Sequence, residues 1–200
     1  GPFLTNVWPL EVPTFRGHAQ ALFTAFETLG ERVLHAIDTH LGLSGDLLER
    51  ATKDGNSVLR LLRYPPADFS GPALRAGPHE DINAITLLLG AEEAGLEILN
   101  RDGTWLAINP PPGAVVVNIG DMLARLTNDV LPSTTHRVVN PTAARQGVAR
   151  YSMPFFLHFR SDFVIETLSQ CVGPGRPNRY PQPITADAFL EQRLREIRLA

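Results

Sequence analysis

Short apolar runs separated by turn-forming residues dominate residues 57–168 of this sequence. The runs cover residues 57–64, 79–89, 95–99, 104–108, 114–119, 134–139 and 148–159, with a last short one at 164–167. Runs of this kind, bounded by Gly and Pro, are typical of β-strands. The chain contains 17 Pro and 16 Gly, which supply many turns. We therefore predict a mainly β sandwich or barrel, in which residues 114–119 form a buried central strand.

Helices are predicted on both sides of this β region. Apolar residues recur three and four positions apart from Phe15 to Leu41, which indicates a long helix with one face against the sheet. A short helix is expected from Ser44 to Thr52, and Thr185 is expected to cap a C-terminal helix. We expect three parts: a helical region packing on the barrel (1–56), the β core (57–168), and a linker with the C-terminal helix (169–200).

The composition argues against several classes of function. The formal net charge is −3, so the chain has no electrostatic signature of a protein that binds nucleic acid or an anionic membrane. No apolar run approaches the length of a membrane span, and no signal peptide is visible. The single cysteine, Cys171, has no partner for an internal disulfide. This fits a reducing compartment, and we expect a cytoplasmic protein whose partner is a small-molecule substrate.

Two histidines and one carboxylate form a candidate metal site. If residues 79–89 make one strand, His79 and Asp81 point to the same face, because side chains alternate along a strand. His136, from a later strand, would complete two imidazoles and one carboxylate. This is the facial triad of non-haem Fe(II) oxygenases, which leaves other metal positions open. A single pair of this type is also common as surface polar residues at a strand end, so the weight rests on the order of all the motifs.

Arg150 and Ser152 repeat the two-residue spacing in an apolar run. The arginine fork binds a carboxylate with two parallel hydrogen bonds, and a serine hydroxyl adds a third donor. A half-buried cation at Arg150 needs an anion, which is either an internal Asp or Glu or an anionic ligand. Tyr64 is a candidate further donor to that ligand, although an aromatic residue at a strand end commonly serves packing alone.

With these residues in view, the sequence resembles the C-terminal catalytic part of the isopenicillin N synthase-like 2-oxoglutarate/Fe(II) dioxygenases. The matching segments are NVWP at 6–9, LLRYPP at 61–66, HEDIN at 79–83, GLEI at 95–98, PGAVVVNIGD at 112–121, STTHRVVNP at 133–141 and RYSMPFF at 150–156. The resemblance implies a double-stranded β-helix, a jelly-roll-like barrel, with helices packed outside and the iron inside its mouth. Glu80 stands where plant members have Thr, and that position is expected to face away from the metal.

The resemblance also implies the cofactors and their ligands. Fe(II) would be held by His79, Asp81 and His136. The co-substrate 2-oxoglutarate would bind with its distal carboxylate at Arg150 and Ser152, helped by Tyr64, and O2 would be the oxidant. A small organic molecule would be hydroxylated or desaturated. Strand alternation places three further residues near the substrate: Asn83, Phe156 and His158.

Two alternatives remain open at this point. Some family members keep the triad and the Arg-x-Ser pair but oxidise their substrate without 2-oxoglutarate. A non-catalytic ligand-binding barrel is the other, and the presence of His79, Asp81, His136 and Arg150 together argues against it. The primary substrate and the oligomeric state do not follow from the sequence. Family members usually carry a further N-terminal segment, so without it we expect exposed apolar surface on the long helix or the barrel flank.

Overall fold

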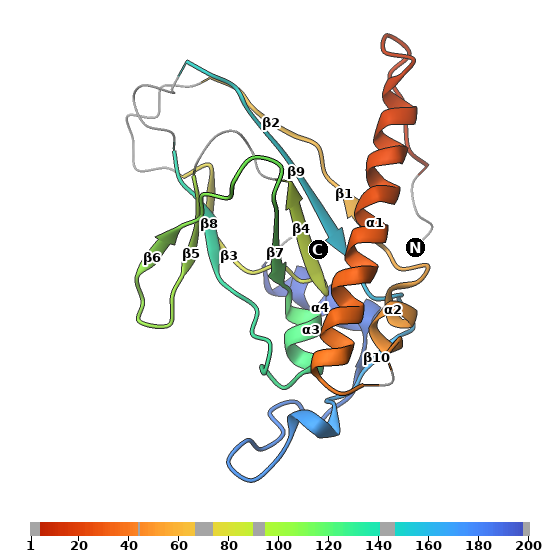
Figure 1. Ribbon diagram of the computed structural model, residues 1–200, viewed down its shortest axis with the longest axis vertical. Coiled ribbons are helices and arrows are strands. Elements are labelled where there is room, and N and C mark those ends of the chain that lie inside the picture. Colours follow the sequence, from red (N-terminus) through yellow and green to blue (C-terminus); the bar gives the residue numbers. More distant parts are fainter. Residues whose placement is uncertain (1–4, 44, 67–73, 90–94, 141–146, 198–200) are drawn as a thin grey trace.

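Two antiparallel sheets form the body of the computed structural model, which describes residues 5–43, 45–66, 74–89, 95–140 and 147–197 (Figure 1). The larger sheet has the order β1-β9-β4-β7, and β2 also pairs with β9. Its strands are β1 (Val58–Leu59), β2 (Leu62–Tyr64), β4 (Ile85–Leu89), β7 (Val115–Ile119) and β9 (Arg150–Leu157). The smaller sheet has the order β3-β8-β5-β6. Its strands are β3 (Ala76–His79), β5 (Leu96–Leu99), β6 (Trp105–Ala107) and β8 (His136–Val138).

The chain passes repeatedly between these two sheets. Strands β2, β4, β7 and β9 belong to the larger sheet, and β3, β5, β6 and β8 lie between them in the sequence and belong to the smaller one. A separate two-stranded sheet pairs β10 (Val164–Ile165) with β11 (Ile184–Thr185). Among the described strands the sheets do not close into a barrel. The prediction of a mainly β fold with flanking helices is confirmed at this level.

The long helix α1 (Phe15–His40) covers the larger sheet, as its apolar periodicity predicted (Figure 1). Phe26 stacks on Phe155 of β9 with ring centroids 5.5 Å apart, and Phe23 meets the same ring edge-on at 5.1 Å. Gly30 lets the helix approach closely, because a Cβ at this position would lie 2.8 Å from a methyl carbon of Leu157. The buried aromatic contact therefore fixes α1 on the sheet whose opposite face carries the candidate site.

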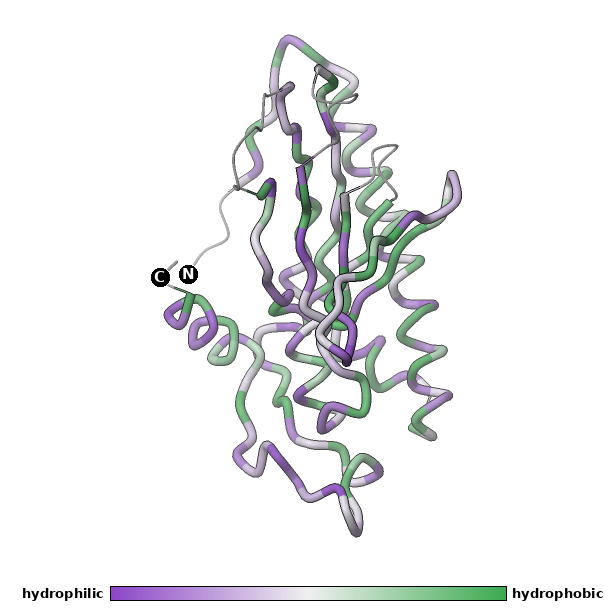
Figure 2. Tube along the Cα trace, turned by 90° about the vertical axis from the view of Figure 1, so that its left-hand side faces the viewer, coloured by the Kyte–Doolittle hydropathy of each residue, from purple (hydrophilic) through white to green (hydrophobic). Residues whose placement is uncertain are grey.

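The other helices are short. They are α2 (Leu47–Thr52), α3 (Asp121–Leu126), the 3-10 helix η2 (Ser169–Cys171) and α4 (Ala186–Glu196). The expected helix at 44–52 begins later than predicted, and Ser44 lies outside the described residues. The cap predicted for α4 is confirmed, since Thr185 Oγ1 accepts from the amide of Ala188 at 3.3 Å. Figure 2 shows hydrophilic and hydrophobic positions alternating along α4, whose Phe189 is buried. No helix in the described ranges is long and apolar enough to span a membrane.

The predicted strand at 57–64 is interrupted. Both of its parts pair with β9 in continuous register, with Leu59 opposite Phe155 and Leu62 opposite Ser152. The gap lies opposite Pro154, whose carbonyl accepts from the amide of Arg60 at 3.0 Å. Proline has no N–H that could donate to the Arg60 carbonyl in turn, so the ladder of backbone hydrogen bonds breaks there.

The strand at 114–119 also differs from the prediction, because β7 ends the described sheet and is half-buried rather than central.

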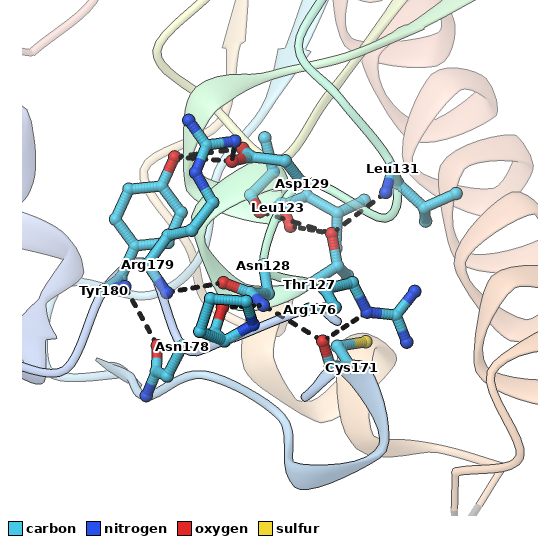
Figure 3. A network of polar contacts seen from close by, with 12 residues as sticks. Leu123, Thr127, Asn128, Asp129, Leu131, Cys171, Arg176, Asn178, Arg179 and Tyr180 are labelled. Atoms are coloured by element: carbon cyan, nitrogen blue, oxygen red, sulfur yellow. Dashed lines mark hydrogen bonds and ion pairs between the residues drawn. The ribbon is translucent and has the colours of Figure 1, made fainter. Parts of the chain in front are cut away.

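The segment between β10 and β11 is tied to the turn that follows α3 (Figure 3). Asn128 has φ +52° and is 2 % exposed. Its amide nitrogen donates to the carbonyls of Cys171 and Pro177 at 3.0 Å each, and its Oδ1 accepts from the amide of Arg179 at 2.9 Å. Asp129 accepts from the Tyr180 hydroxyl and pairs with Arg179. These bonds hold the C-terminal part of the chain against α3, the helix that supports the candidate metal site.

Candidate metal centre and adjoining cavity

His79, Asp81 and His136 come together in space. Their ligand atoms all lie within 4.8 Å of one another. His79 and His136 are cross-strand partners on β3 and β8, and their ring centroids are 4.3 Å apart. Asp81 follows β3 and approaches from the side, with Oδ1 3.8 Å from His136 Nε2. Two imidazoles and one carboxylate thus come together, as the sequence predicted, although Asp81 does so from a turn and not from the strand of His79.

Each imidazole is oriented by a backbone carbonyl two residues earlier. His79 Nδ1 lies 2.8 Å from the carbonyl oxygen of Gly77, and His136 Nδ1 lies 3.1 Å from that of Thr134. A carbonyl oxygen only accepts, so Nδ1 is the donor in both rings, and in the neutral form of each ring Nε2 carries the lone pair. Such a bond from the second nitrogen is the usual support of a metal-binding histidine. Neutral imidazole nitrogens with a carboxylate are a donor set that fits Fe(II).

Asp81 lies in a turn and not in a strand. The prediction of one strand over 79–89 is wrong, since β3 ends at His79 and β4 starts at Ile85. The intervening turn rests on the first residues of α3: the amide of Asp121 donates to the Asp81 carbonyl at 2.7 Å, and that of Met122 to the Asn83 carbonyl at 3.1 Å. The turn directs Asp81 inward, where it is 8 % exposed.

Glu80 points away from the three candidate ligands. Its Oε1 accepts from the Thr135 hydroxyl at 2.8 Å, and the residue is exposed. It lines a different surface groove, between α3 and α4, and not the cavity next to the metal site. The expectation for Glu80 is therefore confirmed. Its bond to Thr135 ties the loop that carries Asp81 to the start of the strand that carries His136.

A cavity of about 180 Å³ opens from the three candidate ligands between the two sheets. Its apolar wall includes residues from both sheets: Leu62, Ala76, Leu88, Leu96, Ile98, Val116, Val138, Pro154 and Phe156. Its polar lining comprises Arg60, Tyr64, His79, Asp81, Thr86, Asn118, Thr134, His136, Arg150 and Ser152. The candidate metal site and the candidate carboxylate site therefore share one largely apolar chamber, which is the usual form of a small-molecule site.

Arg150, Ser152 and Tyr64 lie together on one wall of this cavity. Arg150 and Ser152 are two apart on β9, and Tyr64 is the cross-strand partner of Arg150 on β2. Arg150 is 2 % exposed and Ser152 is 6 % exposed. The Arg150 guanidinium carbon lies 5.3 Å from the centroid of the Tyr64 ring, within the range of a cation–π contact. The structure thus brings together all three residues for which a carboxylate-binding role was predicted.

The three residues predicted near the substrate do not lie together. Phe156 lines the cavity, with the guanidinium carbon of Arg60 5.2 Å from its ring centroid. Asn83 and His158 are not among the lining residues. Asn83 is 1 % exposed and turns its amide toward the Ile85 carbonyl and the Thr86 hydroxyl. Burial lowers the pKa of His158 to about 4, against the opposing charge of Asp81. Strand alternation failed for Asn83 because it lies in the turn before β4.

Sequence reasoning missed two polar residues beside Asp81. Thr86 Oγ1 lies 2.6 Å and Asn118 Nδ2 2.9 Å from Asp81 Oδ2. Both stand as single polar residues inside otherwise apolar strands, Thr86 within 85–89 and Asn118 within 115–119. A buried polar group needs a hydrogen-bond partner, so this interruption was a signal that each of them faces another polar group.

Comparison with known proteins agrees with the geometry. The profile of the 2OG-Fe(II) oxygenase superfamily matches residues 55–159. The chain belongs to this superfamily, and Fe(II), 2-oxoglutarate and O2 are the cofactor and co-substrates of such oxygenases. The match covers every candidate ligand from Tyr64 to Ser152.

Three relatives illustrate the likeness. A crystal structure of a protein assigned to the 2OG-Fe(II) oxygenase family from Caulobacter crescentus is 61 % identical with a TM-score of 0.91, covering 96 % of this chain and 62 % of that one. A full-length Neurospora crassa protein, solved with alpha-KG (2-oxoglutarate) and thymine, is 30 % identical with a TM-score of 0.86, covering 95 % of this chain and 60 % of that one. A 2-oxoglutarate-Fe(II) type oxidoreductase of Emericella nidulans is 36 % identical over 189 residues, covering 91 % of this chain and 53 % of its own length. The chain thus spans between about half and two thirds of these relatives.

Proposed function

We propose that this chain forms the catalytic part of an Fe(II)- and 2-oxoglutarate-dependent oxygenase that hydroxylates or desaturates a small organic molecule. The observation that carries the proposal is the shared cavity: His79, Asp81 and His136 lie at its mouth, and Arg150 and Ser152 line its wall. The superfamily match supports the same reading. We further propose that the two sheets, between which the chain passes repeatedly, represent the double-stranded β-helix of that family.

The proposed ligands for Fe(II) are Nε2 of His79, Nε2 of His136 and Oδ1 of Asp81. Their convergence within 4.8 Å and the orientation of both Nδ1 atoms toward carbonyls support this set. When bound there, Fe(II) supplies the position at which O2 is activated at the expense of 2-oxoglutarate. These three residues would hold the metal, and the cavity that they line would receive the co-substrate and substrate.

The proposed role of Arg150, Ser152 and Tyr64 is to bind the distal carboxylate of 2-oxoglutarate. Arg150 would supply the paired donors and Ser152 a hydroxyl, since both side chains project to the cavity face of β9. Tyr64 lies against Arg150 and lines the same cavity, where its hydroxyl is a candidate third donor. Deep burial of the guanidinium strengthens its attraction for a carboxylate, because little water remains to screen it.

The apolar wall of the cavity has a separate proposed role. The cavity shared by the candidate metal ligands and Arg150 is lined by apolar side chains, among them Leu62, Leu88, Ile98, Val116 and Phe156. Such a lining keeps bulk water from the reacting atoms and suits the carbon skeleton of a small organic substrate. The Neurospora crassa relative has been solved with thymine and with 5-formyluracil, which are both small organic molecules.

The test is an anaerobic titration of the purified protein with Fe(II) followed by 2-oxoglutarate. We expect a visible charge-transfer absorbance band that saturates with 2-oxoglutarate, and slow formation of succinate once O2 is admitted. Tight Fe(II) binding with no band at millimolar 2-oxoglutarate would favour an Fe(II) oxidase that does not use this co-substrate. If neither Fe(II) nor 2-oxoglutarate binds, the chain is a non-catalytic barrel and the proposal is wrong.

A further inference from the structure

Asp81 offers its two carboxylate oxygens to different partners. Oδ2 accepts two hydrogen bonds, from Thr86 Oγ1 at 2.6 Å and from Asn118 Nδ2 at 2.9 Å. Oδ1 faces the other side, 3.8 Å from His136 Nε2. Two donors at hydrogen-bonding distance occupy the lone pairs of Oδ2, so Oδ1 is the oxygen turned to the candidate metal position.

We propose that Thr86 and Asn118 are positioning residues that fix the Asp81 carboxylate so that it binds the metal through Oδ1 alone. The inference rests on the proposed metal site and assigns a role to two residues outside it. A carboxylate that is free to rotate can chelate a metal with both oxygens and fill a second coordination position. By retaining Oδ2, the two donors keep that position open for the co-substrate and O2.

The direction of the Thr86 bond is fixed by Asn83. Asn83 Nδ2 donates to the Ile85 carbonyl at 3.0 Å and to Thr86 Oγ1 at 2.9 Å. Because this amide group only donates, Thr86 Oγ1 is the acceptor there and must direct its own proton to Asp81. Asn83, which strand alternation placed near the substrate, thus completes a short chain of donors that ends at the carboxylate. All three residues of this chain are buried.

The two donors belong to one rigid part of the sheet. Thr86 of β4 and Asn118 of β7 are direct cross-strand partners, so their side chains reach Asp81 from neighbouring positions on the same face. Asp81 itself lies in the turn between β3 and β4, outside the strand ladders. The pair therefore ties a candidate ligand on a turn to two hydrogen-bonded strands of the larger sheet, β4 and β7, which is the kind of support that a metal ligand needs.

The experiment compares Mn(II) binding, measured by electron paramagnetic resonance of free Mn(II), in wild type, Thr86→Val and Asn118→Leu. Each substitution removes the group that donates to Asp81 and keeps a side chain of similar volume. We expect each to weaken Mn(II) binding about 10- to 100-fold. The visible absorbance spectrum of bound Co(II) should also change in both variants, since its bands report the number and arrangement of ligands. Thr86→Ser keeps the hydroxyl and should recover most of the affinity and the wild-type Co(II) spectrum.

Thr52→Val is the matched control, because Thr52 is a buried threonine of α2 outside the cavity, and its hydroxyl donates to the carbonyls of Leu48 and Glu49 in its own helix. It should bind Mn(II) like wild type. Thermal unfolding of the metal-free variants identifies any general loss of structure, and a loss of affinity that Thr86→Ser does not reverse overturns the positioning role. Wild-type affinity and an unchanged Co(II) spectrum in both Thr86→Val and Asn118→Leu also overturn it while leaving the metal site intact. Absence of Mn(II) binding by wild type overturns the proposed function as well.

Discussion

His79 and His136 are direct cross-strand partners on β3 and β8, and each donates Nδ1–H to the backbone carbonyl two residues before it in the sequence. The two rings are thus held by the same kind of backbone hydrogen bond, with their centroids 4.3 Å apart. Their difference lies in exposure: the His136 side chain is 13 % exposed, whereas His79 belongs to the exposed rim. His136 is therefore the more deeply placed of the two candidate imidazole ligands.

Replacement of His136 should remove the metal. His136→Ala takes away one of the three ligands and leaves two, so we expect most of the bound Fe(II), or of Mn(II) used in its place, to be lost while the fold persists. Metal content after gel filtration and the far-ultraviolet circular dichroism spectrum measure the two effects. His18→Ala, on the exposed side of α1, is the control and should keep its metal. A folded His136→Ala protein with stoichiometric metal would show that this ligand is wrongly assigned.

Arg150 should control 2-oxoglutarate affinity without affecting the metal. Charge-assisted hydrogen bonds contribute about 1.5–3 kcal/mol each, so Arg150→Ala should weaken 2-oxoglutarate binding at least about a hundredfold. Arg150→Lys should also bind weakly, because a single ammonium group cannot reproduce the guanidinium fork. The measurement is the anaerobic charge-transfer titration, with Mn(II) affinity as the internal control. If Arg150→Ala titrates like wild type, the co-substrate is anchored elsewhere.

Gly120 should be intolerant of even one added carbon. A Cβ at this position would lie 2.2 Å from the carbonyl oxygen of Asn83 and 2.3 Å from its Oδ1, in the turn that delivers Asp81. Gly120 has φ −102°, so the obstacle is space and not backbone conformation. We expect Gly120→Ala to lower the free energy of unfolding by about 1–3 kcal/mol and to weaken Mn(II) binding.

Gly17→Ala is the matched control for Gly120→Ala. This glycine lies in α1 with open space around its Cβ position, and replacing glycine inside a helix stabilises by about 0.5–1 kcal/mol. Chemical denaturation of both variants measures the contrast. Equal stability of Gly120→Ala and wild type would mean that the turn moves away from α3 at little cost.

The sequence predicted that His79, Asp81 and His136 come together as candidate metal ligands, but not the backbone that brings them together. Same-face projection within one strand was the expected reason for the proximity of His79 and Asp81. The structure instead ends β3 at His79 and uses the amides of Asp121 and Met122 to hold the turn that carries Asp81. These bonds join segments about 40 residues apart in the sequence, and local periodicity contains no information about them.

For the cavity wall with Arg150, Ser152 and Tyr64, the sequence predicted the local backbone as well. Arg150 and Ser152 follow strand alternation, so their two-residue spacing placed them on one face correctly, and Tyr64 reaches the same wall because it is paired with Arg150 across the strands. Thr86 and Asn118 needed the register of β4 against β7, which a single sequence does not give. The break between β1 and β2 was readable in principle from Pro154, but only once its partner strand was known.

Apolar surface beside β1 should cause weak self-association. A groove of about 650 Å³ runs between the N-terminal segment, α1 and β1, and Val58 and Leu61 on its rim are 40 % and 43 % exposed. A contiguous patch of exposed apolar side chains favours association between copies of a protein. Light scattering should show a mass that rises with protein concentration, and Leu61→Lys should reduce this rise. Leu106→Lys, at a 54 % exposed leucine on β6, should not. A monodisperse monomer at all concentrations would contradict the expectation.

His158 should make the metal-free protein less stable in acid. Burial lowers its pKa from an unfolded value of 6.5 to about 4, outweighing the attraction of Asp81. Between these values the unfolded chain binds the proton and the folded one does not, so the free energy of unfolding falls as the pH drops from about 6.5 to about 4. The full loss is about 3 kcal/mol. Urea denaturation in chelator at several pH values measures it, with His158→Gln as the variant that lacks this titration. Parallel pH profiles for wild type and His158→Gln would show that His158 accepts a proton equally well in the folded state.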